Sequence, residues 1–351
     1  MTFLKKLSTA VAMGALVLTA GIGSVAQAAD YTIKMVFLGN ANDEDNDGSM
    51  VFKDYVEAAS NGAIEVQIYP GGQLCGNTNE CLESLQGGVI EVHITTIGGF
   101  GSIYPEIMAL DLPYTFDDDR IAEMTLSGPF EDYLREKVLE KSGNIRLMTI
   151  TQTGGWRNIV NSKHEVRTPA DVKGLKLRTI PSELQQELVK LLGGSPTAVP
   201  WPEVYTSLAT GVVDGTKNGI TDIVGMKFDE HVKFMTLDGH AYMAAFWWMN
   251  NDMFMSMPFE LRKIVNDGFE HLRGVTTAFP KRNQIEAYEE FKKSGGKIYV
   301  PTPAEKDLFK KAAAPLTKWY TDKYGTELLD QLKAGVKLAR EQLAAEHAKL
   351  K

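Results

Sequence analysis

The stretch that most constrains the fold runs from residue 175 to residue 194. Residues 175–180 read L-K-L-R-T-I, so apolar and polar side chains alternate as in a half-buried strand. Residues 183–192, E-L-Q-Q-E-L-V-K-L-L, follow with helical spacing, and two glycines then stop the helix. Arg178 is thus expected near the C-terminal end of a strand that leads into a helix, where open α/β sheets bind ligands. Its planar guanidinium matches the geometry of a carboxylate.

The N-terminal part of the chain alternates strands and helices. Strands are predicted at residues 31–37, 64–69 and 89–96, with helices at 49–60 and 79–86 between them. This order implies a parallel sheet with helices on its faces.

Two longer strands and a long helix organise the rest of the chain. A strand at 144–153 leads to Gly154-Gly155, which are predicted to form a hinge, and an apolar strand at 234–250 returns to the first sheet. Three helices close the chain, at about 258–294, 303–321 and 326–349. The predicted fold class is α/β, with two hinged lobes and a long connecting helix.

The first 28 residues have the features of a secretory signal peptide. Lys5 and Lys6 precede an apolar core at 10–23, and A-Q-A at 26–28 matches a cleavage site. We therefore expect a protein that is exported to the periplasm and cleaved after Ala28. No later apolar run approaches 18 residues, so no direct membrane insertion is expected.

Net charge bears on the partners of the chain. The formal charge is −8, and loss of Lys5 and Lys6 makes it more negative by two. This balance argues against nucleic acid and against anionic membrane surfaces as partners.

Four linked motifs resemble the solute-binding proteins of TRAP (tripartite ATP-independent periplasmic) transporters. They read G-G-W-R-N at 154–158, T-P-A-D-V-K-G-L-K-L-R at 168–178, W-P-E-V-Y-T-S-L at 201–208 and G-V-V-D-G-T-K-N-G at 211–219. The resemblance is clear over about residues 30–260. It implies a two-lobed, hinge-closing periplasmic binding protein that captures a small organic anion and delivers it to the membrane permease subunits of a TRAP transporter.

The resemblance also implies roles for four residues. Arg178 would clamp the ligand carboxylate, Arg157 and Asn218 would assist it, and the ring of Trp201 would pack flat against the solute. The ordinary alternatives are a structurally paired arginine, a strand-edge arginine, a turn asparagine and a core aromatic. The bound acid stays open among C4-dicarboxylates, sugar acids, 2-oxo acids and small sulfonates.

The predicted lobes are made of separated segments of the chain. After the signal peptide at 1–28, lobe I takes residues 29–153 and about 240–280. Lobe II takes residues 154–239, and the C-terminal helices at about 281–351 are expected to pack on it and across the lobes.

Cys75 and Cys81 are the only cysteines of the chain. In the oxidising periplasm they could form a local disulfide, and a pair of reduced structural thiols is the alternative. Cysteines and histidines at suitable spacing for a zinc site are too few.

The acidic loop D-E-D-N-D-G at 43–48 allows three interpretations. Asp43, Asp45, Asp47 and Asp54 match the spacing of an EF-hand calcium loop, although a strand and not a helix precedes them. Alternatively the loop is solvated and Asp47 caps the next helix. In the third interpretation the acids border the cleft opposite Arg178, which would suit a ligand with a carboxylate and a cationic or hydroxylated end.

No catalytic motif is found. The chain lacks a G-x-S-x-G elbow, an H-E-x-x-H pair and a dinucleotide fingerprint, so we expect neither an enzyme nor a cofactor. A binding protein of an ATP-driven importer is the alternative function, and a secreted enzyme is a more remote one.

Overall fold

The computed structural model describes residues 29–351, so the predicted signal peptide at 1–28 lies outside the described residues. Nine strands form one mixed sheet in the order β2-β1-β3-β8-β4-β7-β5-β6, with β9 also paired to β8. The strands are β1 (Tyr31–Val36), β2 (Ile64–Tyr69), β3 (Val92–Thr96), β4 (Ile145–Asn161), β5 (Lys176–Thr179), β6 (Ser195–Ala198), β7 (Gly215–Asn218), β8 (Phe234–Asn250) and β9 (Lys297–Tyr299).

Helices cover both faces of this sheet. The α-helices are α1 (Glu44–Ala59), α2 (Thr78–Gln86), α3 (Asp119–Leu126), α4 (Pro129–Ser142), α5 (Glu183–Leu191), α6 (Val204–Ala209), α7 (Ile220–Gly225), α8 (Asn251–Ser256), α9 (Phe259–Lys293), α10 (Pro303–Ala313), α11 (Pro315–Tyr324) and α12 (Glu327–Ala348). The 3₁₀ helices are η1 (Ile97–Ser102), η2 (Pro105–Asp111), η3 (Pro169–Val172), η4 (Trp201–Glu203) and η5 (Phe228–Glu230).

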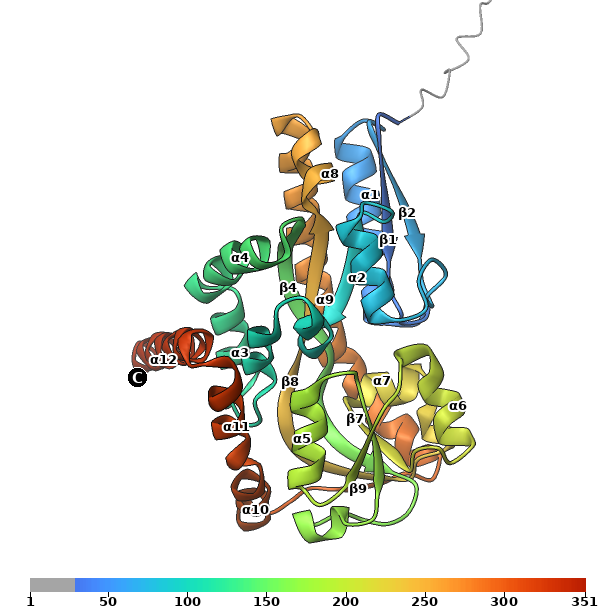
Figure 1. Ribbon diagram of the computed structural model, residues 1–351, viewed down its shortest axis with the longest axis vertical. Helices are drawn as coiled ribbons and strands as arrows, with labels where there is room; N and C mark the ends of the chain where they lie inside the picture. Colours follow the sequence, from blue (N-terminus) through green and yellow to red (C-terminus); the bar gives the residue numbers. More distant parts are fainter. Residues whose placement is uncertain (1–28) are drawn as a thin grey trace, which may run out of the picture.

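The elements gather into two lobes joined by the long strands β4 and β8 (Figure 1). We call the end with β1, β2, β3, α1 and α2 the first lobe, and the end with β5, β6, β7, α5, α6 and α7 the second lobe. β4 and β8 pair antiparallel and continue through both ends, so one sheet serves both lobes. Helix α9 runs beside this pair and contacts both α1 and α7.

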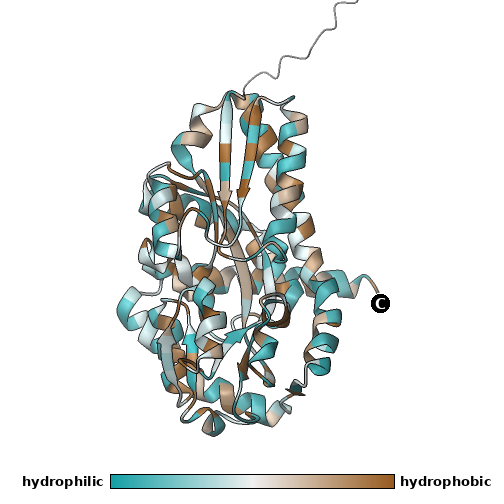
Figure 2. Ribbon diagram, turned by 90° about the vertical axis from the view of Figure 1, so that its right-hand side faces the viewer, coloured by the Kyte–Doolittle hydropathy of each residue, from teal (hydrophilic) through white to brown (hydrophobic). Residues whose placement is uncertain are grey.

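Alternation of side chains along the strands creates a core on each face of the sheet. In Figure 2, hydrophobic and hydrophilic residues alternate along the strands nearest the described N-terminus. The neighbours Trp247 and Trp248 on β8 are both fully buried but enter different apolar clusters, because successive side chains point to opposite faces. Trp247 packs with residues of α1 and α9, whereas Trp248 packs with residues of α2 and the C-terminal helices. Such two-sided burial explains the almost continuously apolar sequence of this strand.

The crossing point between the lobes is marked by two glycines on β4. Gly154 and Gly155 have φ values of +65° and +85°, a region that favours glycine. The pairing of β4 with β8 shifts register there, between Gln152 and Trp156. A Cβ added to Gly219, at the start of α7, would lie 1.5 Å from the carbonyl oxygen of Gly154. The backbone of the crossing point is therefore packed directly against the second lobe.

Two helix predictions were wrong. Helix α1 begins at Glu44 and not at residue 49, because Asp43 caps it by accepting a hydrogen bond from the N–H of Asp45 at 3.2 Å. The helix expected at 303–321 is divided into α10 and α11, with Pro315 at the first position of the second.

The C-terminal helices contact the second lobe and the helices that lie between β3 and β4 in the chain. Helices α10 and α11 contact α5, and α12 contacts α3, α4 and η2. The hydroxyl of Tyr320 on α11 donates to the carbonyl of Glu106 at 2.6 Å, while the hydroxyl of Tyr324 donates to Glu183 at 3.0 Å. Between residues 29 and 351, every helix is too short or too polar to traverse a bilayer.

Candidate functional site

A cleft lies where the C-terminal ends of strands from the two lobes meet, as expected for ligand sites in α/β sheets. Its empty volume is about 920 Å³, including its open mouth. The first lobe lines it with Leu38, Gly39, Asp43, Asp45, Asn77, Thr78, Asn79, Ile94, Thr95 and Thr96. The remaining lining residues are Thr153, Arg157, Arg178, Ile180, Pro181, Pro200, Trp201, Asn218, Asp222 and Met243.

The structure brings all four predicted ligand-binding residues to this cleft. Arg178, near the end of β5, is 2 % exposed, and its Nε donates to the carbonyl of Val199 at 2.9 Å. Neither of its terminal nitrogens has a hydrogen-bond partner among residues 29–351. Burial, with the nearby charge of Arg157, lowers the pKa of Arg178 to about 9, so it is still a cation at neutral pH.

Arg157 lies beside Arg178, on the second-lobe half of β4. Its Nη1 donates to the carbonyl of Lys217 at 3.0 Å, and the residue is 3 % exposed. Its Nε is buried and has no partner within the described chain. Two anchored guanidinium groups therefore face the same cleft, an arrangement that attracts an anion.

Trp201 borders the arginine side of the cleft at the start of η4. The Cζ atom of Arg178 lies 5.3 Å from the centre of the Trp201 ring, within cation–π distance. The ring also meets Phe228 edge to face, with 5.3 Å between ring centroids. The indole thus both contributes to the second-lobe core and forms part of the cleft wall.

Asn218 is already engaged by the chain on both sides of its amide. Its Nδ2 donates to Asp222 Oδ2 at 2.8 Å, and its Oδ1 accepts from the hydroxyl of Thr216 at 2.7 Å. An amide nitrogen carries two hydrogens, so one N–H is left to meet a ligand.

The acidic loop does not have the geometry of an EF-hand loop, so that interpretation was wrong. Residues 44–59 form one continuous helix, and Asp54 lies exposed within it. In the described range 29–351, no group of three or more His, Cys, Asp and Glu side chains is arranged to hold a metal ion. The capping role predicted for Asp47 was also wrong, because Asp43 takes that position.

The third interpretation of the loop agrees with the geometry, since Asp43 and Asp45 line the cleft. Glu44 turns to the crossing point, where its Oε1 accepts a hydrogen bond from the N–H of Gly154. Burial raises the pKa of Glu44 to about 7, with a further contribution from the charge of Asp222. The pKa values of Asp43 and Asp45 are also raised, first by burial and then by neighbouring carboxylates.

Two buried charged residues of the second lobe, Asp222 and Lys217, were not predicted from the sequence. Asp222 lines the cleft, four residues after Asn218, and this i, i+4 spacing on a turn into a helix is the signal that could have identified it. Lys217 lies behind the cleft, 2 % exposed, and its Nζ donates to Gln185 at 3.3 Å. Burial and the charge of Arg157 lower the pKa of Lys217 to about 7.

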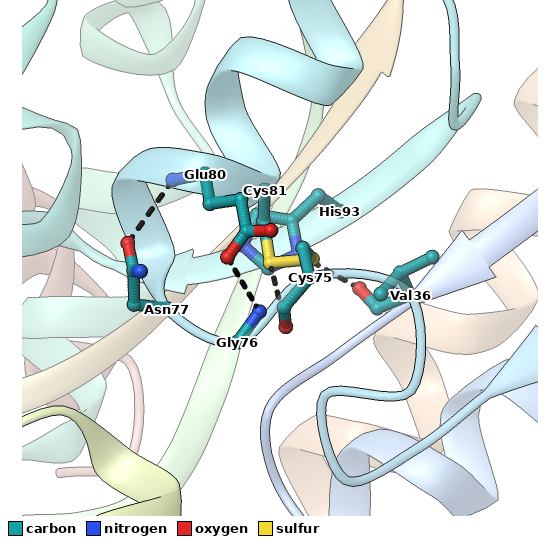
Figure 3. The surroundings of a disulfide bond; sticks show 7 residues. All are labelled: Val36, Cys75, Gly76, Asn77, Glu80, Cys81 and His93. Atoms are coloured by element: carbon teal, nitrogen blue, oxygen red, sulfur yellow. Dashed lines mark hydrogen bonds between the residues drawn. A yellow bond between two sulfur atoms is a disulfide. The ribbon is translucent and has the colours of Figure 1, made fainter.

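A disulfide holds the first-lobe edge of the cleft (Figure 3). Cys75 and Cys81 are bonded, with their Cα atoms 5.1 Å apart. Within the loop that they close, Asn77 caps α2 by accepting from the N–H of Glu80 at 3.1 Å, and Glu80 accepts from the N–H of Gly76 at 2.8 Å. Because residues 77–79 line the cleft, this bond fixes a segment of its wall.

Comparison with known proteins gives consistent matches over most of the chain. Residues 39–323 match the bacterial extracellular solute-binding proteins of family 7. The 2,3-diketo-L-gulonate-binding periplasmic protein of Escherichia coli is 27 % identical over 82 % of this chain and 86 % of its own. The C4-dicarboxylate-binding periplasmic protein of Rhodobacter capsulatus is 26 % identical over 92 % of this chain and 96 % of its own.

A solved structure extends the likeness to the fold. A TRAP periplasmic solute-binding protein from Polaromonas, bound to D-erythronate, is 25 % identical and superposes with a TM-score of 0.81. The match covers 87 % of this chain and 98 % of that one. The two-lobed α/β fold predicted from the sequence is confirmed.

Proposed function

The chain belongs to the bacterial extracellular solute-binding proteins of family 7, and from that premise we propose that its cleft captures a small organic anion for a TRAP permease. The observation that carries the proposal is the position of Arg178. It is buried in the cleft, anchored through Nε to Val199, and has two terminal nitrogens free for an incoming carboxylate. A bidentate pair of this kind is among the strongest hydrogen-bonded contacts in proteins.

Arg157, Asn218 and Trp201 complete the proposed ligand site. Arg157 adds a second positive charge, Asn218 has one amide hydrogen to donate, and the Trp201 ring offers a flat surface to the solute. None of these contacts needs a chemical step, and we propose capture and release without turnover.

Closure of the cleft would be stabilised by a ligand that contacts both lobes at once. We propose that the lobes divide at the Gly154-Gly155 crossing point and near residue 240, giving residues 29–153 and about 240–280 to lobe I and residues 154–239 to lobe II. The long helix α9, which contacts both lobes, would guide the motion together with the C-terminal helices.

Delivery to the permease and location in the periplasm belong to the same proposal. The relatives from Escherichia coli and Rhodobacter are periplasmic proteins, and the Polaromonas structure is a TRAP component. Residues 1–28 would then be removed as a signal peptide. Uptake in the native cells should stop when ion gradients are collapsed with ATP maintained, whereas an ATP-driven importer would continue to work.

The test is a thermal-shift screen of residues 29–351, refolded to remove bound solute. Dicarboxylates, sugar acids, 2-oxo acids and sulfonates are supplied at about 1 mM, where a micromolar ligand adds roughly 4 kcal/mol to the free energy of unfolding. Arg178→Gln should lower the affinity for whichever anion binds by about 100-fold or more, because the substitution removes a charged, bidentate contact.

Arg282→Gln, at an exposed arginine of α9, is the matched control and should leave affinity unchanged. Equal affinity of Arg178→Gln and the natural protein would overturn the clamp. A product formed from any bound anion would show turnover and overturn the proposal of capture alone.

A further inference from the structure

The first-lobe side of the cleft carries carboxylates rather than cations. Asp43 and Asp45 come from the start of α1, and Asp222 from α7 faces them across the cleft. We propose that the ligand carries a positively charged nitrogen as well as its carboxylate, and that this acidic wall binds the nitrogen while Arg178 binds the carboxylate. The proposal rests on the proposed function, and it names the ligand class as a zwitterion.

The side chain of Asp45 is the strongest support for a positively charged nitrogen in the ligand. This side chain lines the cleft, the residue is only 7 % exposed, and its Oδ1 is buried without a hydrogen-bond partner in the described chain. An ionised carboxylate only accepts hydrogen bonds, and leaving one buried without a donor is unfavourable. A ligand N–H group at this place would supply the missing donor.

The other two acids are only partly satisfied. Asp43 accepts one hydrogen bond, from the N–H of Asp45, and Asp222 accepts one from Asn218. Among residues 29–351, none of the three forms an ion pair with a lysine, arginine or histidine. Asp43 and Asp45 thus line the cleft without the influence of a cation from the described chain.

The charges are also segregated within the cleft. Burial raises the pKa of Asp222, while the hydrogen bond from Asn218 and the charges of Arg157 and Arg178 act to lower it. Burial raises the pKa of Asp45, and the neighbouring carboxylates of Asp43, Glu44 and Asp222 raise it further, with no cation of the described residues acting against them. A ligand that spans the cleft therefore meets guanidinium cations at one end and carboxyl groups without a compensating cation at the other.

This pattern discriminates among small acids. The second carboxylate of a dicarboxylate would lie among Asp43 and Asp45 and be repelled. A hydroxyl would donate one hydrogen bond but would leave the repulsion between the carboxylates in place. An ammonium group donates up to three hydrogen bonds and neutralises charge, so it matches this wall best.

The experiment compares probes that differ only at their far end. Calorimetry measures 4-aminobutanoate, 4-hydroxybutanoate and succinate, and the corresponding three-carbon and five-carbon sets cover other spans. In the best-binding length we expect the amino acid to bind about 10- to 100-fold more tightly than the hydroxy acid, in line with one charge-assisted hydrogen bond. The dicarboxylate should bind most weakly.

Variants of two aspartates on the same helix assign the preference to the wall. Asp45→Asn should reduce the preference for the amino acid over the hydroxy acid to within a factor of about three, because the amide is neutral. Asp54→Asn, at an exposed position of α1, should leave the preference unchanged.

Each result decides between the two proposals. Tighter or equal binding of the hydroxy acid or the dicarboxylate overturns the zwitterion and leaves the anion receptor standing. A preference for the amino acid that survives Asp45→Asn overturns the assignment of the ligand nitrogen to the acidic wall and also leaves the anion receptor standing. If the anion screen finds a ligand but no amino acid probe binds, the zwitterion fails alone. If binding persists unchanged in Arg178→Gln, the proposed function fails together with the inference.

Discussion

The two walls of the cleft are built on different principles. On the second-lobe wall, Arg178 is held by the carbonyl of Val199 and Arg157 by that of Lys217, so each guanidinium is oriented by backbone. On the first-lobe wall, Asp45 has no donor for its Oδ1 and the nearest charges share its sign. One wall therefore offers oriented cationic donors without acceptors, and the other offers buried carboxyl groups without a donor.

Separating the walls should have the largest effect. In Gly219→Ala the new methyl would overlap the carbonyl of Gly154, and backbone cannot move aside cheaply. We expect the free energy of unfolding to fall by about 3 kcal/mol, the upper range for overpacking, measured by urea denaturation. Affinity for the anion should fall as well, because the two walls would no longer meet at this distance.

Gly274→Ala on α9 is the control, since a methyl there meets no atom within 4 Å. It should stabilise the protein by about 0.5–1 kcal/mol through the helix preference of alanine. Equal stability of the two variants would show that the backbone at the crossing point shifts to make room for the methyl group at little cost.

Replacing the buried acid Glu44, which lies next to the acidic wall, should change the stability of the protein by an amount that depends on pH. The pKa of Glu44 is raised to about 7 by burial and by Asp222, above its ordinary value of 4.5. A raised carboxyl pKa means that stability is present below the ordinary value and is lost as pH rises through the folded one. Glu44→Gln keeps an acceptor for the N–H of Gly154 but cannot ionise. The free energy of unfolding of this variant should be higher than that of the natural protein by up to about 3 kcal/mol at pH 8. At pH 4 the two values should be almost equal.

Glu57, on the same helix, has a pKa that is shifted in the opposite direction. Its pKa is lowered by hydrogen bonds from Lys53 and from the N–H of Val66, which outweigh its burial. Glu57→Gln should therefore destabilise the protein at neutral pH and lose its effect as pH falls below the ordinary carboxyl range. Identical pH profiles for both variants would contradict the distinction between Glu44, buried beside the acidic wall, and an ordinary surface acid.

Reducing the disulfide should loosen the first-lobe edge alone. Cys75 and Cys81 are six residues apart, and chain-entropy arguments give about 2 kcal/mol for a loop of this size. We expect a paired Cys75→Ser, Cys81→Ser variant to melt several degrees lower, measured by calorimetry. Arg178 would keep its anchor to Val199, so the anion should still bind, though more weakly because residues 77–79 line the cleft. Full loss of binding would mean that the basic wall depends on this edge.

The sequence predicted those features that depend on local patterns. Strand β8 was predicted at its observed bounds, 234–250, because it is a long apolar run. The observed bounds of helix α9 differ from the predicted ones by one residue at each end, and the prediction came this close because Pro258 and Gly295 flank the helix. The resemblance to TRAP solute-binding proteins is confirmed by the family match. Arg178 could be located because strand, turn and helix follow one another directly.

Features that arise from tertiary packing could not be predicted in this way. Asp45 and Asp222 are 177 positions apart in the numbering, and only folding of the two lobes places them in one cleft. The raised pKa of Glu44 likewise depends on its burial against Gly154, which no local pattern encodes. The start of α1 was misplaced for a more local reason, since Asp47 and not Asp43 was taken as its cap.

The smallest expected effect comes from the ring that borders the basic wall. Trp201→Leu keeps an apolar side chain against Phe228 but removes the cation–π contact with Arg178, whose Cζ lies 5.3 Å from the ring. We expect affinity for the anion to fall about 10-fold, which corresponds to roughly 1.4 kcal/mol, in a calorimetric titration. Trp319→Leu on α11 is a matched control, because Lys323 lies 5.3 Å from that ring outside the cleft. Trp319→Leu should lose its cation–π contact with Lys323 without any change in affinity for the anion. If both variants bind equally well, Trp201 serves the core of the second lobe, and the basic wall consists of its guanidinium groups alone.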